Sequence, residues 1–273
     1  MPELPDVEYL RRYAEATSLH KRIERSSLES DRLLEDTTPQ LLARRLKAAE
    51  LSAARRHGKH LFLELADADS GSAANPSAAS GRGALMLHFG MTGSLDYAAD
   101  GDLPEYTQLA IQFADGSRLA YTVRRMLGAI AIVGDVPGYI REQGLGPDAL
   151  EITVAQLEEV IRGGRGAVKS TLMNQSRLAG LGNIYTDEVL FHARINPGRA
   201  CSEISDEEIR IIHDQIRDVC ITAADARADP KAMPGTYLIR RREPGLPCPR
   251  CGAEVEKVTI SGRSAYLCPR CQE

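Results

Sequence analysis

The stretch 248–271, CPRCGAEVEKVTISGRSAYLCPRC, decides how the end of this chain folds. It contains two CxxC pairs with sixteen residues between them. Two such pairs can surround one tetrahedral Zn²⁺ with four thiolates, which leaves no open position for a substrate. Because the stretch is too small to bury a core of its own, metal binding would supply its folding free energy. We therefore expect one structural zinc, with iron as the less common alternative. The expected ligands are Cys248, Cys251, Cys268 and Cys271.

The residues between the two pairs predict a β-hairpin over 258–267, with Arg263 near its tip. An arginine on such a tip can reach a phosphate, and a plain surface arginine is the alternative. Upstream, LAGLGNIYTDEVLF at 178–191 places two glycines before Asn183, which we expect to be the N-cap of a helix. The N–H groups at a helix start bind anions, and Lys169 would add positive charge there. A plain packing corner between two helices is the alternative.

The length of 273 residues favours two domains. The first half alternates apolar and polar residues, which predicts an antiparallel β-structure with flanking helices. We expect strands at 60–65, 84–90, 107–113, 119–123 and 128–134, and helices at 5–18 and 37–50. A segment dense in Gly and Pro, 134–152, marks the boundary. After it the period is helical, at 153–163, 167–175, 183–195 and 205–226, where Ser205 and Glu208 form a capping box.

Composition excludes several classes of protein. No apolar run approaches the roughly 18 residues of a membrane-spanning helix. The N-terminus has no apolar region typical of a signal peptide, so we expect a cytoplasmic protein whose paired cysteines bind metal. The net charge of −4 does not indicate nucleic-acid binding by itself, but 231–273 carries eight basic against four acidic residues. The Ala-, Ser- and Gly-rich segment 67–83 predicts a long flexible loop.

Two further stretches carry residue types that suggest chemistry. At the start, MPELPDVEYL places Pro2 after the initiator methionine. Removal of Met1 would leave a secondary amine beside the carboxyl group of Glu3, which is a nucleophile next to an acid. In HFGMTGSL, at 88–95, Met91 lies on a turn between two glycines, an unusual place for a core residue. An apolar wedge that fills the gap left by an extruded base would have such a placement.

Six motifs in this order resemble the formamidopyrimidine-DNA glycosylase and endonuclease VIII family of DNA repair enzymes, over nearly the whole chain. They are PELPDVE at 2–8, GK at 58–59, GMTGSL at 90–95, LGPDAL at 145–150, GLGNIYTDE at 180–188 and the cysteine stretch. The resemblance implies a two-domain α+β fold, with an N-terminal β-sandwich and a C-terminal helix–two-turn–helix region followed by a zinc ribbon. The expected domains are 1–134 for the catalytic sandwich, 135–150 for a linker, 151–235 for the helical region and 236–273 for the ribbon.

The same resemblance implies roles for individual residues. Pro2 would be the nucleophile, Glu3 the acid that assists opening of the sugar ring, Lys59 a phosphate contact that serves in β-elimination, and Arg263 the group linked to δ-elimination. Met91, Arg125 and Leu127 would fill the duplex after base flipping, which costs a few kcal/mol. The remaining residues of the expected DNA-binding set are Tyr106, Arg165, Lys169 and Asn183.

The resemblance implies a monomeric, bifunctional DNA glycosylase and abasic-site lyase that acts on double-stranded DNA. Leu-Pro in PELP favours the formamidopyrimidine branch, hence oxidised purines, formamidopyrimidine first and 8-oxoguanine second. Two departures from the family pattern concern the substrate: Asp6 stands where glutamate is common, and the lesion-capping segment 226–248 is short and lacks a Gly-Tyr-Phe signature. Leu127 stands where phenylalanine is usual and Met126 where arginine is usual, which concerns recognition of the base opposite the lesion. The alternatives are the same chemistry on oxidised pyrimidines, and a non-catalytic binder of damaged DNA. A zinc-ribbon protein acting on RNA is disfavoured because the chain has no Trp and four Phe.

Overall fold

The computed structural model describes residues 2–68 and 82–273. Most of the expected flexible loop at 67–83, and Met1, lie outside the described residues. The chain forms two compact units. The N-terminal unit holds the chain up to Pro2 and Val7–Gln143, and the C-terminal unit holds Glu3–Asp6 and Gly144–Glu273. The initial segment of the chain is therefore shared between them.

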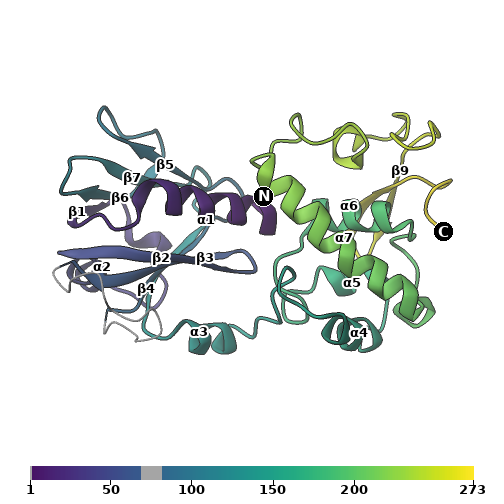
Figure 1. The fold of residues 1–273 in the computed structure, drawn as a ribbon, viewed down its shortest axis with the longest axis horizontal. Coiled ribbons are helices and arrows are strands. Elements are labelled where there is room, and N and C mark those ends of the chain that lie inside the picture. Colours follow the sequence, from purple (N-terminus) through teal and green to yellow (C-terminus); the bar gives the residue numbers. More distant parts are fainter. Residues whose placement is uncertain (1, 69–81) are drawn as a thin grey trace. The chain divides into compact units, whose positions relative to one another are not determined.

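The N-terminal unit is built on two four-stranded antiparallel sheets (Figure 1). One sheet has the order β1-β6-β7-β5 and the other β2-β3-β4-β8. Their bounds are β1 Ile23–Leu28, β2 Ala49–His57, β3 His60–Asp67, β4 Ala84–His88, β5 Ser94–Ala98, β6 Thr107–Phe113, β7 Arg118–Thr122 and β8 Ala129–Val133. Apolar side chains from both sheets share one core, as an aligned sandwich requires. The expected β-sandwich is confirmed.

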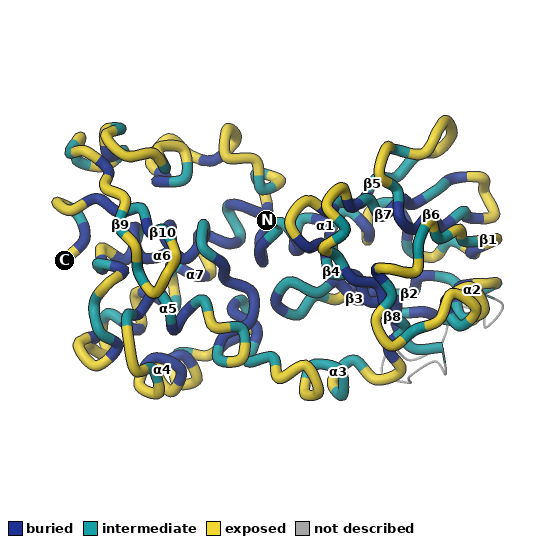
Figure 2. Tube along the Cα trace, turned by 180° about the vertical axis from the view of Figure 1, so that it is seen from behind, coloured by how far each residue is buried: buried dark blue, intermediate teal, exposed yellow. Residues whose placement is uncertain are grey.

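Helices and one 3-10 turn complete this unit. Helix α1 (Leu4–Ser18) buries Val7, Leu10 and Ala14 in the sandwich core, at the helical spacing that predicted it. The 3-10 turn η1 is Asp31–Leu33 and helix α3 is Val136–Glu142. Helix α3 lies within the segment expected to be a linker and has no buried residue, so it is drawn teal and yellow in Figure 2.

Helix α2 (Pro39–Leu46) is shorter than the predicted 37–50. Its N-cap is Thr38, whose Oγ1 accepts a hydrogen bond from the Leu41 N–H at 3.2 Å. After Leu46 the chain turns through Ala48, which has a positive φ of 57°. It then enters β2, which pairs with β3. The prediction of helix up to residue 50 was wrong because strand pairing outweighs the helix propensity of these residues.

The C-terminal unit contains four helices, two 3-10 turns and a two-stranded sheet among its described residues. Their bounds are α4 Val154–Arg162, α5 Val168–Leu172, α6 Asn183–Ala193, η2 Cys201–Glu203, α7 Asp206–Asp225, η3 Leu238–Arg241, β9 Glu256–Ile260 and β10 Arg263–Leu267. Helix α7 packs along α6 and α4 (Figure 1). The capping box of Ser205 and Glu208 opens α7 as predicted. No described helix is long and apolar enough to cross a membrane.

Helix α6 is buried on nearly every side. Its polar residues Thr186, Asp187 and Glu188 are buried together with Val189, Leu190 and Phe191. A helix buried all round must pair its polar side chains internally, because an unpaired polar group in the interior is costly. Asp187 and Glu188 have such partners, whereas the Oγ1 atom of Thr186 has none among the described residues. The partners of the two carboxylates therefore define how the rest of the C-terminal unit is attached to α6.

Candidate functional site

The start of α6 holds the carboxylate of Glu3. Glu3 is 1% exposed. Its Oε2 accepts hydrogen bonds from the backbone N–H groups of Gly182, at 3.0 Å, and Tyr185, at 3.1 Å. Its Oε1 accepts from the N–H of Ile184 at 2.9 Å. The carboxylate thus satisfies three N–H groups at the helix start, where the helix dipole also favours a negative charge.

The expected N-cap of α6 is corrected by this arrangement. Gly182 is the N-cap and Asn183 is the first helical residue. Glycine has no capping side chain, and the Glu3 carboxylate takes over that task from a distant part of the sequence. The Oδ1 atom of Asn183 is buried and has no hydrogen-bond partner among the described residues.

Two glycines of the GLGN stretch make room for the N-terminal segment. A Cβ atom on Gly182 would lie 2.3 Å from Cδ of Glu3. Gly180 has a φ of +120°, and a Cβ there would lie 2.5 Å from Cδ1 of Leu4. The Leu4 N–H donates to the Gly180 carbonyl oxygen at 3.1 Å. The spacing of these glycines therefore reflects close approach of two chain segments as well as a helix start.

Asp6 fixes the backbone of Glu3 from the other side. Its Oδ2 accepts a hydrogen bond from the Glu3 N–H at 2.9 Å. Burial raises the pKa of Asp6 to about 6, and the nearby charge of Glu3 contributes in the same direction. Pro2 immediately precedes Glu3 and is half-buried. The residue expected to be the nucleophile is thus bonded directly to a residue whose backbone and side chain are both held.

Lys59 lies in the tight turn between β2 and β3. His57 and His60 are the paired residues that flank it, and Gly58 supplies a positive φ of 57°. Two-residue hairpin turns require such a conformation at a central position. Arg56 donates from Nη1 to the Gly58 carbonyl oxygen at 3.0 Å, which ties the turn to its own strand. The structure therefore presents Lys59 at a defined hairpin tip.

Two histidines beside this turn are neutral near pH 7. Burial lowers the pKa of His60 to about 3, and the proximity of His88 adds to the effect. Burial also lowers the pKa of His88, and the charge of Lys59 contributes. The two rings lie 5.0 Å apart, centroid to centroid. Neither histidine therefore places a second positive charge beside the side chain of Lys59 at that pH.

The expected wedge residues lie on two adjacent turns of the N-terminal unit. Met91 and Leu127 are 38% and 52% exposed, which is high for large apolar side chains. A Cβ on Gly90 would lie 2.3 Å from the carbonyl oxygen of Leu127, so the two turns are in close contact. Arg125 is exposed on the second of them. The structure thus brings together the three residues for which a role in filling the duplex was expected.

Tyr106 is another exposed aromatic residue of this unit, at 43%. It has a positive φ of 65°, which is uncommon for a bulky residue, and strained backbone of this kind is enriched at functional sites. The guanidinium carbon of Arg124 lies 5.5 Å from its ring centroid. Its expected contact with DNA stays a prediction.

Arg263 begins β10 directly after the turn of the β9–β10 hairpin. Ser261 and Gly262 have positive φ values of 49° and 77°, as a two-residue type I′ turn requires. The predicted hairpin is therefore confirmed. Arg263 is exposed, and within 2–68 and 82–273 no acidic side chain forms an ion pair with it. Its guanidinium group is available to an external anion such as a phosphate.

The four cysteines of the two CxxC pairs converge. Their Sγ atoms all lie within 4.8 Å of one another. Cys251 and Cys268 are 3.4 Å apart, and Cys248 and Cys271 are 3.9 Å apart. Four sulfurs at the Zn–S bond length would be separated by about 3.8 Å in a tetrahedron. The residues therefore fit one structural Zn²⁺, which would tie β9–β10 to the chain on both sides.

The other expected phosphate contacts are distributed unevenly. Arg165 is exposed on the loop between α4 and α5. Lys169 is 1% exposed, and its Nζ donates to Oδ1 of Asp187 at 2.6 Å. Sequence reasoning missed Asp187, Glu188 and Arg242, which all bind within this unit. The available signal was a helix with apolar residues on every side, in which acidic residues have to be internally paired.

The fold and site define a class of proteins in which an N-terminal Pro-Glu precedes a β-sandwich, and a helical unit ends in a zinc ribbon. Sequence profiles of three families match successive parts of the chain. The Formamidopyrimidine-DNA glycosylase N-terminal domain matches residues 1–130, the Formamidopyrimidine-DNA glycosylase H2TH domain 144–230, and the zinc finger found in FPG and IleRS 245–273. The chain belongs to the formamidopyrimidine-DNA glycosylase family.

Individual relatives agree with this assignment. The chain is 31% identical to the formamidopyrimidine-DNA glycosylase of Symbiobacterium thermophilum, over 100% of this chain and 89% of that protein. It is 33% identical to that of Pelobacter propionicus, over 100% of both. A Lactococcus lactis Fpg structure with abasic-site DNA superposes with a TM-score of 0.83 at 27% identity, over 100% of both chains. A structure of MutM with DNA containing carbocyclic 8-oxo-G gives 0.82 at 26%, also over 100% of both.

Proposed function

We propose that this protein is a base-excision repair DNA glycosylase that also cleaves abasic sites as a lyase, with oxidised purines as its substrates. The observation that carries the proposal is the fixed Glu3 carboxylate, bound by three N–H groups and joined directly to Pro2. Relatives named formamidopyrimidine-DNA glycosylase support it, as do similar structures described with DNA that contains an abasic site or Fapy-dG.

The chemistry follows from a secondary amine at the chain end. After removal of Met1, the Pro2 nitrogen attacks C1′ of the damaged nucleotide, the N–C1′ bond forms and the bond from C1′ to the base breaks. An α-amino group has a pKa near ~8, so part of it is neutral at cell pH. The Glu3 carboxylate takes the proton that the Pro2 amine loses and passes it to the ring oxygen, so the bond from that oxygen to C1′ breaks and the sugar ring opens, while the departing base takes a proton from water. The resulting iminium ion withdraws electrons from the sugar.

Strand cleavage then proceeds from the iminium ion. It acidifies the C2′ proton, and loss of that proton expels the 3′-phosphate in β-elimination, in which Lys59 takes part. Conjugation of the product allows loss of the 5′-phosphate in δ-elimination, which we assign to Arg263. Both leaving groups are phosphates, and a cation near each one stabilises the developing charge.

DNA binding is assigned to exposed side chains of both units. Met91, Arg125 and Leu127 fill the duplex, and Tyr106 and Arg165 bind the backbone. Asn183 contacts a phosphate through its side chain, since the N–H groups of the first turn of α6 are taken by Glu3. We propose the functional domains 1–134, 135–150, 151–235 and 236–273, and a monomer that works in the cytoplasm at the nucleoid.

A borohydride trap tests the proposal. Mature protein would be incubated with duplexes that contain 8-oxoguanine, formamidopyrimidine, thymine glycol, dihydrouracil or an abasic site. We expect a covalent adduct that requires a free Pro2 amine, so Pro2→Gly or retention of Met1 should reduce its yield. Faster trapping on the purine lesions supports the assigned substrate, and faster trapping on the pyrimidine lesions contradicts it. Tight abasic-site binding with no adduct on any duplex would mean a non-catalytic damage binder.

A further inference from the structure

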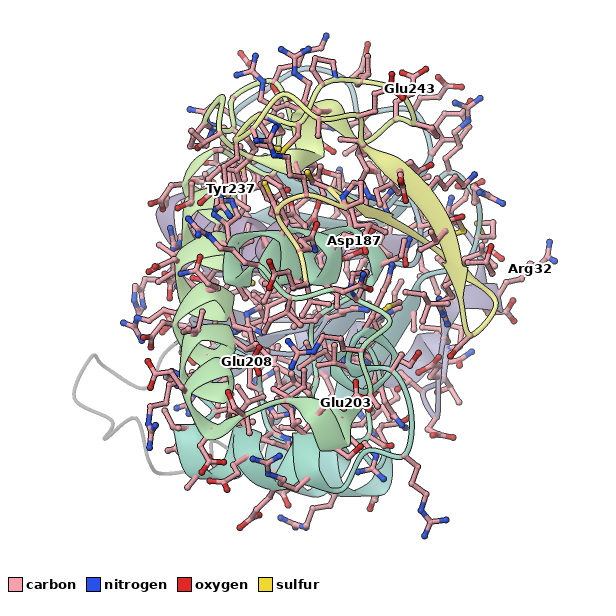
Figure 3. The ribbon with its side chains drawn as sticks, turned by 90° about the vertical axis from the view of Figure 1, so that its right-hand side faces the viewer. Arg32, Asp187, Glu203, Glu208, Tyr237 and Glu243 are labelled. Carbon is pink, nitrogen blue, oxygen red and sulfur yellow. The ribbon has the colours of Figure 1, made fainter. Side chains whose placement is uncertain are left out.

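Asp187, a residue of α6 that is labelled in Figure 3, is the centre of a hydrogen-bond network that joins α6 to the β9–β10 hairpin. It is 1% exposed. Its Oδ1 accepts a hydrogen bond from Lys169 Nζ at 2.6 Å. Its Oδ2 accepts from Arg242 Nη2 at 2.8 Å and from the backbone N–H of Tyr266 at 3.1 Å. Lys169 Nζ also donates to the carbonyl oxygen of Ser264 at 2.8 Å.

The two bonds to β10 reproduce a strand-pairing pattern. On a parallel neighbour, one residue accepts the N–H of residue i+1 and donates to the carbonyl of residue i−1. Here Asp187 accepts from Tyr266 and Lys169 donates to Ser264, on either side of Ala265, which is 0% exposed. The other edge of β10 pairs with β9. The Lys169–Asp187 pair therefore occupies the free edge of β10, as a single residue of a third strand would.

These contacts flank Arg263 on both sides. Before it, the Oγ atoms of Ser261 and Ser170 lie 2.9 Å apart, so α5 also holds the hairpin turn. After it, the carbonyl of Ser264 is held by Lys169. Arg242 stacks on the ring of Tyr266, with 4.3 Å from its guanidinium carbon to the ring centroid, and fixes the next position. The backbone around Arg263 is thus held while its side chain is exposed.

The chemistry of the pair indicates positioning more than stability. A buried ion pair gains little over an apolar pair of the same volume, because both charges have to leave water. An apolar pair cannot accept the Tyr266 N–H or donate to the Ser264 carbonyl. A group that acts on a transition state has to be held within a fraction of an ångström, by neighbours that are themselves fixed. The pair supplies such a support for the strand that carries Arg263.

We propose that Asp187, together with Lys169, is a positioning residue for Arg263. The inference rests on the proposed function, in which Arg263 serves the second elimination. In this proposal Lys169 does not make the phosphate contact expected from the sequence and instead holds the backbone of β10 through the Ser264 carbonyl oxygen. Loss of the pair leaves Pro2, Glu3 and Lys59 unchanged, so the Schiff base and the first elimination should persist while δ-elimination declines.

The test compares Asp187→Asn with Asp206→Asn in the zinc-loaded protein. Asp206 is an exposed carboxylate of the same unit that pairs with Arg162 at 2.5 Å, so its variant is a matched control. On an abasic-site duplex we expect Asp187→Asn to lower the ratio of δ- to β-elimination product about tenfold, the effect of losing one charge-assisted hydrogen bond from a positioned group. The yield of borohydride adduct and the zinc content should equal those of the parent. An unchanged product ratio overturns the proposal.

A double variant, Lys169→Met with Asp187→Leu, covers the case in which an unpaired buried lysine prevents folding. It leaves neither charge of the pair behind, so it should fold with zinc bound and still lower the product ratio. A folded double variant with the parent ratio also overturns the proposal.

Hydrogen exchange gives a readout that does not depend on catalysis. The peptide covering 263–267 should exchange about tenfold faster in either variant, because local opening no longer breaks a charge-assisted bond to Tyr266. Unchanged exchange shows that the pair does not hold β10 and overturns the inference. Failure of the proposed function looks different, since the parent itself would then give no adduct and no cleavage.

Discussion

Replacing Glu3 with glutamine should destabilise the C-terminal unit, although Glu3 is expected to be a catalytic residue. Removal of a catalytic carboxylate commonly leaves stability unchanged or raises it, because active sites hold strained or unpaired groups. Glu3 differs because each of its bonds is also a cap of α6. Oε2 accepts from Gly182 and Tyr185, and Oε1 accepts from Ile184.

The magnitude follows from counting acceptors. Glutamine has one carbonyl oxygen, so if it serves Gly182 and Tyr185, its amide NH₂ faces the N–H of Ile184. One buried N–H is then unsatisfied, which costs about 1–3 kcal/mol. Loss of the negative charge at the helix start costs about 1 kcal/mol more. The expected loss of unfolding free energy is therefore about 2–4 kcal/mol, and the Tm of the C-terminal unit should fall by roughly 10 °C.

The assay is calorimetry or far-UV circular dichroism, since the chain has no Trp to report unfolding by fluorescence. The two units can unfold in separate transitions, so each transition has to be followed. The transition of the C-terminal unit should shift, because all three donors belong to it. Glu207→Gln is the control: its side chain is 76% exposed, and its pairing with Arg210 contributes little. A Glu3→Gln protein within 0.5 kcal/mol of the parent, roughly the range of neutral surface substitutions, would refute the reasoning.

Three further results are expected. Gly182→Ala should reduce borohydride trapping by about a hundredfold, because its Cβ would lie 2.3 Å from Glu3 Cδ. Gly235→Ala, whose Cβ would have no atom within 4 Å, should give the trapping yield of the parent, and equal yields for the two variants would contradict this prediction. Burial raises the pKa of Asp6 from 3.8 to about 6, so the native state binds this proton more tightly and stability falls as pH rises between those values. In urea titrations the stability of Asp6→Asn relative to the parent should therefore increase by up to about 3 kcal/mol from pH 4 to pH 8, and a constant difference would argue against an effect of Asp6 burial. Cys268→Ser should lose both the zinc and DNA binding, measured by zinc analysis and a binding titration. Cys201→Ser should keep both, because its thiol lies outside the four-cysteine cluster. A Cys268→Ser protein that still contains zinc would contradict the zinc assignment.

Local patterns in the sequence predicted much of the fold. The spacing of the cysteines is a local code, and the ribbon follows from it. Strands β3, β4, β6, β7 and β8 carry enough apolar residues to be recognised. The strands β1 and β2 do not: β1 reads IERSSL and β2 AELSAARRH, with few apolar positions. Both are strands because β6 pairs with β1 and β3 pairs with β2, and the β-propensities of single residues do not include the free energy of that pairing.

The candidate site was likewise predicted only in part. Resemblance identified Pro2 and Glu3, but the partners of the Glu3 carboxylate lie about 180 residues further along the chain. The stretch NIYTDEVLF predicts a helix, yet its acidic residues read as a solvated face until the surrounding apolar positions are counted. Contacts that join distant segments decide which polar residues are buried, and no single local window contains them.

Helix α6 fixes two expected catalytic groups from one rigid body. Its first turn holds Glu3, and Asp187, in its second turn, holds the strand that begins with Arg263. Glu188 adds a third attachment, since its carboxylate accepts from the N–H groups of Leu238 and Ile239 at 2.8 and 2.7 Å. Because α6 is buried almost all round, none of these attachments can shift without opening the core. Glu3 and Arg263, to which the proposed mechanism gives the roles of acid and δ-elimination group, therefore keep one mutual geometry. Under that proposal, substitutions along α6 should divide by position into those that affect Schiff-base formation and those that affect the last elimination.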